Sequence, residues 1–213
     1  MDPISVIIFI FILLFSVIFH EVAHGLAADR LGDPTARYSG RLTLNPIPHI
    51  DLFGSILLPA FLYFLGLPVL GAAKPVPVNF QNLRNIKRDT ILVSLAGPGM
   101  NFLLAAIAGM VFRFSPNLSS MGTILILQTV SLNLVLGIFN LIPIPPLDGS
   151  KVIASLLGFI NEGLMDIFFR FERFGFFLVY LLLIGGVLFR ILIPPLLYLF
   201  EIFTGIEYRA NLF

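Results

Sequence analysis

Long runs of apolar residues limit what this sequence can fold into more than any other feature. A helix that crosses the hydrocarbon core of a bilayer needs about 20 mostly apolar residues, because the core is about 30 Å thick and each helical residue rises about 1.5 Å. Several segments meet this requirement, and they predict an all-α membrane protein that folds as a polytopic helical bundle. The four predicted spanning helices are Ile4 to about Ala28, about Thr90 to Phe114, about Thr123 to Leu141, and about Phe174 to Phe203 with a kink or an end at Pro194-Pro195.

The composition supports this prediction and excludes other classes of protein. Of 213 residues, 58% are apolar and 12% are charged, whereas soluble domains have roughly 45–50% and roughly 25%. This balance excludes a disordered chain, a basic nucleic-acid-binding protein and an ordinary soluble enzyme. Cysteine is absent, so any transition-metal site must use His, Asp or Glu side chains. The length predicts a single domain over residues 1–213.

A fifth apolar segment, from Leu52 to Leu70, is long enough to cross a bilayer but is interrupted by glycines and prolines. Non-helical backbone at membrane depth is tolerated where it is buried in protein or lines a wet cavity. We therefore expect residues 51–78 to form a re-entrant helix followed by an extended return to the same side. A fifth spanning helix is the alternative. The interruptions are Gly54, Pro59, Gly66 and Pro68.

The distribution of basic residues favours the re-entrant interpretation. Lys and Arg concentrate on the cytoplasmic side of membrane proteins. If residues 51–78 do not cross, Arg113 and Arg209 lie opposite the other basic residues, and Arg190 falls inside the last span. We therefore expect an integral protein of the cell membrane with its N-terminus outside, and the small size suggests a prokaryote. The residues on the cytoplasmic side would be Arg30, Arg37, Arg41, Lys74, Arg84, Lys87, Arg88, Lys151, Arg170 and Arg173.

The first predicted span ends in a His-Glu-Val-Ala-His motif at residues 20–24. Histidines four residues apart lie on one face of a helix, so the imidazoles of His20 and His24 can reach one ion. Glu21 lies beside them, where it can take a proton from a metal-bound water, as in the zinc hydrolase pattern HExxH. Counted back from Arg30, His24 lies about 9 Å and His20 about 15 Å into the membrane. Ionisable residues at that depth are costly and indicate function; a buried polar cluster that joins helices is the alternative.

A catalytic zinc ion takes a third protein ligand, commonly a carboxylate, and keeps an open position for water. Asp148 is the best candidate, because it lies in the segment 140–149, which ends the third predicted span. Three prolines in four residues force an extended chain there, and an extended chain can project a carboxylate into a cavity. The alternative is that Asp148 caps a helix that begins near Ser150. The other acidic residues considered are interpreted as loop, capping or interfacial residues: Asp29, Asp33, Glu162, Asp166 and Glu172.

The motif at residues 20–24 and the segment from Asn140 to Gly149 resemble those of the site-2 protease family of intramembrane zinc metalloproteases. The pair is highly specific in this order and in a membrane context. The resemblance covers roughly residues 5–160. It includes two further segments, Ala73-Lys74-Pro75-Val76-Pro77-Val78 and Gly97-Pro98-Gly99-Met100-Asn101.

The resemblance implies one zinc ion held by His20, His24 and Asp148, with Glu21 as the general base. It implies a zinc metalloendopeptidase whose active site opens toward the cytoplasm. The expected substrate is a transmembrane segment of a single-pass membrane protein, and the expected partners are this substrate and the lipid bilayer. The sequence has neither the PDZ-like insert nor the C-terminal nucleotide-sensing module of some relatives, so we expect a compact, core-only member.

Two further features are candidates for contacts with a substrate. Asn140 is a candidate catalytic residue that hydrogen-bonds the oxyanion or the substrate backbone; a hydrogen bond between helices is an equal alternative. Pro75 and Pro77 remove N–H groups from one edge of an extended segment and leave the other edge free to pair with an extended substrate. A rigid linker explains these prolines equally well.

Three other features are given structural interpretations. The Gly97-Pro98-Gly99 sequence is expected to bend the second span or to let a neighbour approach closely, and Asn101 is expected to serve the same packing. His49 is interpreted as a loop histidine with a local hydrogen bond, with a ligand or substrate contact as the alternative.

Two other functions compete with an intramembrane peptidase. A transporter or metal-binding membrane protein would need a file of polar residues along its pathway, but the apolar segments outside the two motifs carry few ionisable residues. A catalytically silent relative would need a damaged motif, whereas Glu21 and the three expected ligands are all present.

Overall fold

The structure is a computed structural model that describes residues 3–66, 73–115 and 117–207. Within these residues every regular element is helical, which confirms the predicted all-α class. The elements are α1 (Pro3–Leu31), α2 (Thr35–Tyr38), η1 (Ile47–His49), η2 (Leu52–Leu57), α3 (Leu58–Phe64), η3 (Phe80–Asn82), α4 (Ile86–Phe114), α5 (Ser120–Asn140), α6 (Asp148–Ile160), α7 (Glu162–Ile184) and α8 (Val187–Thr204). The predicted single domain over residues 1–213 stays a prediction.

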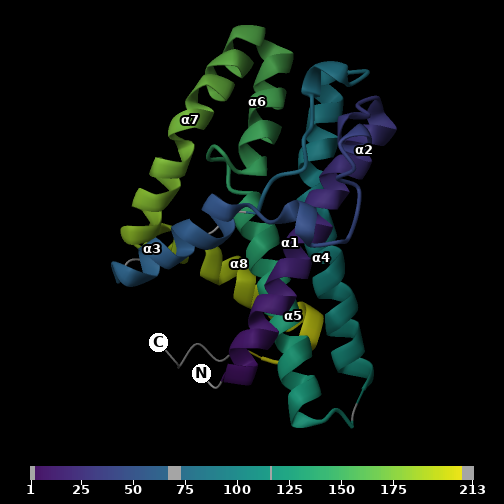
Figure 1. The fold of residues 1–213 in the computed structure, drawn as a ribbon, viewed down its shortest axis with the longest axis vertical. Helices are drawn as coiled ribbons and strands as arrows, with labels where there is room; N and C mark the ends of the chain where they lie inside the picture. Colours follow the sequence, from purple (N-terminus) through teal and green to yellow (C-terminus); the bar gives the residue numbers. More distant parts are fainter. Residues whose placement is uncertain (1–2, 67–72, 116, 208–213) are drawn as a thin grey trace.

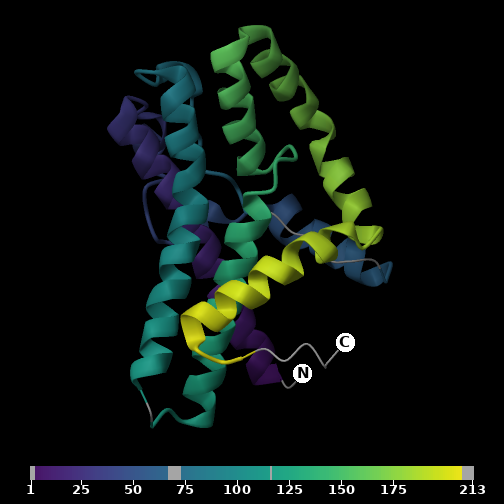
Figure 2. The same cartoon turned by 180° about the vertical axis from the view of Figure 1, so that it is seen from behind.

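Among the residues that the structure describes, four helices are long and apolar enough to cross a membrane: Ile7–Leu31, Ile86–Phe114, Ser120–Asn140 and Val187–Thr204. The chain is therefore an integral membrane protein with four candidate spans. Helices α1, α4 and α5 run along the long axis of the molecule (Figure 1), and α8 crosses them obliquely on the other side (Figure 2). Helix α4 packs against α1, α5 and α6, which makes it the central element of the bundle.

The fourth predicted span is wrong in its boundaries. The chain does not continue as one helix from Phe174 to Phe203, because α7 ends at Ile184 and α8 begins at Val187 after two glycines. Gly186 has a φ of 70°, a left-handed conformation that glycine adopts without the steric cost of a Cβ atom. Pro194 and Pro195, where the kink or end was predicted, lie inside α8 instead.

Two residues that flank the fifth apolar segment, His49 and Lys74, are hydrogen-bonded to each other. The backbone N–H of Lys74 donates a hydrogen bond to the carbonyl of His49 at 2.9 Å, so the chain returns to the point from which it left. The helical part between them, Leu52–Phe64, has 6 residues in η2 and 7 in α3 and lies across the bundle axis (Figure 1). This geometry agrees with a segment that does not cross and argues against the alternative of five spans. Residues 67–72 of this segment lie outside the described residues.

After this excursion the chain passes over α1 as a non-helical segment, residues 73–79, called the strap below. The buried Arg41 side chain holds its first part, because Nη2 donates to the carbonyl of Lys74 at 2.8 Å. Asp33 holds its far end by accepting a hydrogen bond from the backbone N–H of Asn79 at 2.7 Å. The strap is thus fixed at both ends above the His-Glu-Val-Ala-His turn of α1.

Asp33 is well suited to this role because several donors surround its carboxylate. Burial raises the pKa of Asp33, but the hydrogen bonds from Thr35, Asn82 and Asn79 lower it more, so the pKa lies below its ordinary value. Its charged form is therefore the one that the fold favours. This confirms the interpretation of Asp33 as a loop residue, with a structural role in placing the strap.

Candidate metal centre

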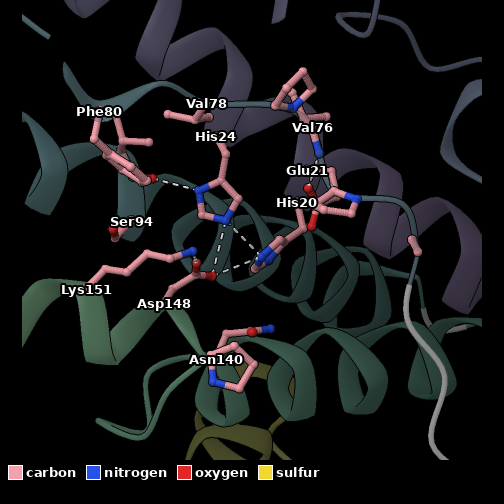
Figure 3. A pocket seen from close by; sticks show the side chains of 15 residues that line it. His20, Glu21, His24, Val76, Val78, Phe80, Ser94, Asn140, Asp148 and Lys151 are labelled. Carbon is pink, nitrogen blue, oxygen red and sulfur yellow. Dashed lines mark hydrogen bonds and ion pairs between the residues drawn. The ribbon is translucent and has the colours of Figure 1, made fainter. Parts of the chain in front are cut away.

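His20 and His24 lie one turn apart on α1 and point in the same direction (Figure 3). Both are buried, with 6% and 8% of their surface exposed, and their Nε2 atoms are 3.0 Å apart. The helical spacing seen in the sequence therefore does bring the two imidazoles to one point.

Asp148 completes a group of three. It is the first residue of α6, and its Oδ2 atom lies 3.2 Å from the Nε2 atoms of both His20 and His24. Its other oxygen, Oδ1, lies 3.7 Å from Nζ of Lys151. The side chain makes no capping hydrogen bond to α6, whose N-cap is Leu147, so the capping alternative for Asp148 is wrong.

The loop before α6 brings Asp148 to the histidines. The chain between α5 and α6, residues 141–147, folds back so closely that a Cβ atom on Gly149 would collide with the carbonyls of Leu141 and Ile142. Glycine is therefore required next to Asp148. In this way α6 begins directly beside α1 although the two are distant in the sequence.

Helix α4 fixes the orientation of both imidazole rings. Nδ1 of His24 donates a hydrogen bond to the carbonyl of Val93 at 2.7 Å, and Nδ1 of His20 lies 2.6 Å from Oδ1 of Asn101. Gly97 lies between these two contacts, where a Cβ atom would collide with both rings. The prediction that the Gly97 region allows a close approach is therefore confirmed, and the neighbour is the histidine pair.

Asn101 is the residue that the sequence reasoning missed, since it was given only a packing role. It is fully buried, with 0% of its surface exposed, and it contacts a histidine of the motif directly. A signal was present, because a polar amide inside a spanning helix is costly unless it is hydrogen-bonded.

The three converging atoms suit a cation. A carbonyl oxygen only accepts hydrogen bonds, so Nδ1 of His24 carries a proton, and in the neutral ring Nε2 is then a bare acceptor. The same holds for His20 if Asn101 presents its oxygen. Two bare nitrogens and a carboxylate oxygen repel one another unless a positive charge lies between them.

The distances fit a zinc ion. Nitrogen and oxygen ligands of zinc lie about 2.0–2.1 Å from the ion in tetrahedral geometry, which places them about 3.3 Å from one another. The three separations here are 3.0, 3.2 and 3.2 Å. Two histidines and one carboxylate are a usual ligand set of catalytic zinc. No other group of three or more potential ligands was found among the residues that the structure describes.

A cavity of about 470 Å³ opens beside these three residues (Figure 3). Its wall is formed by α1, α4, the end of α5, the start of α6 and the strap. Glu21 lines it, and Oε2 of Glu21 accepts a hydrogen bond from the backbone N–H of Val76 in the strap at 2.8 Å. The cavity thus contains the three candidate ligands, a carboxylate beside them, and one edge of an extended segment.

Two further candidates from the sequence, Asn140 and His49, are not among the three converging residues. Asn140 lines the cavity, but its Nδ2 donates to the carbonyl of Leu136 in its own helix at 2.9 Å; its catalytic role stays a prediction. His49 is buried, and its Nε2 lies 2.9 Å from the carbonyl of Thr43. The predicted local hydrogen bond of His49 is therefore confirmed, but the residue is the last of the short helix η1 and does not lie in a loop.

Comparisons with known proteins identify the family of the chain and zinc metalloproteases among its relatives. Residues 117–186 match the model described as "Peptidase family M50". The chain is 37% identical over 194 residues to "Putative zinc metalloprotease YwhC" of Bacillus subtilis, a match that covers 85% of this chain and 82% of the relative. It is 31% identical over 201 residues to "Putative zinc metalloprotease Rip2" of Mycolicibacterium smegmatis, which covers 91% of this chain and 73% of the relative. No solved structure matches the chain significantly.

Proposed function

Because this chain belongs to peptidase family M50, the site-2 protease family, and is a zinc metalloendopeptidase of the membrane, we propose that it cleaves a transmembrane segment of single-pass membrane proteins. We assign the zinc ion to His20, His24 and Asp148 and the role of general base to Glu21. The observation that carries this proposal is the convergence of the three ligand atoms beside Glu21 in one cavity, with both histidines and Glu21 inside the candidate span Ile7–Leu31.

The protein groups divide the work of peptide hydrolysis. The zinc ion, when bound, polarises the scissile carbonyl and lowers the pKa of the attacking water. Glu21 accepts a proton from this water and delivers it to the leaving amine nitrogen. The Val76 N–H holds Oε2 of Glu21, so the other oxygen, Oε1, is available for the proton.

The strap suits a substrate that is unwound locally. A helical substrate hides its peptide bonds, so the scissile residues must become extended before they reach the site. Pro75 and Pro77 have no N–H, and the N–H of Val76 is used by Glu21. The N–H of Val78 makes no hydrogen bond within the described part of the chain. An extended substrate can pair with this free group in the manner of an added strand.

Zinc removal tests the proposed function. The protein is reconstituted in liposomes with a single-span peptide, and cleavage is followed before and after treatment with a zinc chelator. We expect cleavage to stop when zinc is removed and to return when zinc, but not magnesium, is added back. Cleavage that continues in protein shown by metal analysis to be free of zinc would contradict the proposal.

We also propose that the site opens toward the cytoplasm. Helix α6 and the start of α4 lie toward the same end of the bundle as α2, and the end of α4 and the start of α5 lie at the opposite end (Figure 1). The basic residues Arg30, Arg37 and Arg84 therefore share one end, as the positive-inside rule requires. Arg113, at the other end, donates to the carbonyl of Ile202 near the end of α8 at 2.7 Å. Arg209 lies outside the described residues.

Labelling of single cysteines tests this orientation, because the natural chain has none. Both Arg84 and Asn117 are exposed and lie at opposite ends of α4. We expect a membrane-impermeant maleimide to label Asn117→Cys in intact cells and Arg84→Cys only after the membrane is opened. Labelling of both variants in intact cells, or the reverse pattern, would overturn the orientation.

A further inference from the structure

A chain of buried polar side chains runs from His20 into the bundle. It consists of Asn101 on α4, Asn133 on α5 and Ser16 on α1, with 0%, 0% and 4% of their surfaces exposed. Asn101 Nδ2 donates to Asn133 Oδ1 at 2.9 Å, and Asn133 Nδ2 donates to Ser16 Oγ at 2.9 Å. Three spanning helices therefore meet at one hydrogen-bonded cluster next to the proposed zinc site.

Backbone carbonyls decide which way each amide faces. Asn133 Nδ2 also lies 2.9 Å from the carbonyl of Thr129, and a carbonyl can only accept. Asn133 must therefore place its NH₂ group there and turn Oδ1 toward Asn101. Asn101 Nδ2 faces this oxygen and, at 3.3 Å, the carbonyl of Ser16. Both contacts require a donor, so Asn101 must present Oδ1 to His20.

The fixed orientation of Asn101 sets the tautomer of His20. Since Asn101 offers an acceptor at 2.6 Å, Nδ1 of His20 must carry the proton, and the lone pair of Nε2 is directed at Asp148 and His24. If the Asn101 amide turned over, its NH₂ would favour a bare Nδ1 and a protonated Nε2, which cannot bind a metal. The orientation of the Asn133 amide on α5 therefore determines, through Asn101, whether Nε2 of His20 on α1 can bind a metal ion.

We propose that Asn101 and Asn133 are positioning residues for zinc: Asn133 orients the Asn101 amide, and Asn101 holds His20 in the tautomer that can ligate the ion. The proposal rests on the assignment of His20 as a zinc ligand. Hydrogen bonds between membrane helices commonly serve packing alone. This series of hydrogen bonds differs in two ways. One of its ends is a candidate zinc ligand, His20, and at the other end the carbonyl of Thr129 fixes which groups donate and which accept.

Zinc affinity measured without substrate tests the proposal. Purified protein is titrated against a chromophoric chelator, and helical content is checked by circular dichroism. We expect Asn101→Leu and Asn133→Leu each to weaken zinc binding by about 10–100-fold, the usual cost of losing an outer partner of a ligand. Unchanged affinity in both variants would overturn the proposal.

Two further variants separate positioning from packing. Asn133→Asp keeps an acceptor for Asn101 Nδ2, so it should keep zinc affinity close to that of the unaltered protein, although it lowers stability because it buries a carboxyl group and removes the NH₂ group that faces Thr129 and Ser16. Leu134→Ala removes a fully buried side chain of the neighbouring apolar cluster on the same helix and should lower thermal stability without changing zinc affinity. If Asn133→Asp loses zinc like Asn133→Leu, or if Leu134→Ala does so too, the role is packing only.

The outcome for this inference is independent of the outcome for proteolysis. The affinity measurements contain no substrate, so they report on His20 and its partners alone. If the asparagine variants lose zinc as expected while the unaltered, zinc-loaded protein cleaves no membrane-spanning peptide, the positioning role stands and the proposed function fails. If cleavage is found but the asparagine variants bind zinc normally, the proposed function stands and the positioning role fails.

Discussion

Replacing Glu21 with glutamine is expected to abolish measurable proteolysis and to leave the zinc content unchanged. Glutamine has nearly the same shape, and its side-chain oxygen can still accept the hydrogen bond from Val76 N–H. It cannot take a proton from water, however, and general acid–base catalysis contributes about 10²–10⁴ to a rate. The measurement is kcat on a single-span peptide in liposomes, together with metal analysis of the same preparations.

Glu201→Gln is the matched control for this experiment. Glu201 is exposed near the end of α8 and has no role in the proposed site, so this variant should cleave at the rate of the unaltered protein. Retained cleavage by Glu21→Gln would remove Glu21 as the base. A loss of zinc in that variant would instead indicate a structural role for the carboxylate.

Asp148→Ala is expected to lose the metal itself. With the carboxylate gone, only the two imidazoles of His20 and His24 remain of the usual three protein ligands of catalytic zinc. We therefore expect the zinc affinity to fall by more than the about 10–100-fold that follows from loss of an outer partner. Cleavage should be lost in parallel. The measurement is zinc stoichiometry after gel filtration and affinity by chelator competition.

The control is a buried carboxylate that does not belong to the group of three candidate ligands. Asp89 lies in the first turn of α4, is 4% exposed, and accepts a hydrogen bond from the backbone N–H of Asn85 at 2.9 Å. Asp89→Ala should lower thermal stability and keep zinc. An Asp148→Ala protein with unchanged zinc stoichiometry would show that the ligand set has been assigned wrongly.

Three of the spanning helices were predicted close to their observed bounds, and α4 is one of them although Pro98 lies inside it. Helices α1, α4 and α5 follow directly from runs of about 20 apolar residues. The last span was misplaced because hydropathy does not distinguish one long helix from two shorter ones joined by a turn. The prediction placed the break in the helix at Pro194-Pro195, but proline inside a membrane helix can be accommodated by neighbouring groups. The two helices are separated instead at Gly186, which adopts a left-handed conformation.

The candidate ligands were predictable for two different reasons. His20 and His24 are related by helical spacing, which is local and can be read from the sequence. Asp148 is 124 positions away from His24, and the sequence left open whether it capped α6 instead. Only the fold of the chain between α5 and α6 decides that its carboxylate faces the imidazoles.

The partners behind the ligands could not be predicted. The hydrogen bond between Asn101 and His20 depends on how α4 is rotated against α1, and the contact between Asn101 and Asn133 depends on a third helix. A single sequence gives the polar residues in each helix but not which of them face one another. The contact between Glu21 and the strap is of the same kind, because Val76 contributes a backbone group that any residue except proline would offer.

The absence of a side chain at Gly97 lets α4 press directly against both imidazoles, and the third candidate ligand begins α6, which also packs on α4. An ion held by His20, His24 and Asp148 would therefore join two helices, α1 and α6, whose ligands are more than 100 positions apart in the sequence, around one central helix. Because such an ion binds only when α1, α4 and α6 are packed together, zinc binding and the packing of these helices are thermodynamically linked. The contact of α4 with the two imidazoles would then orient the zinc ligands and also stabilise the packing of α1 against α4.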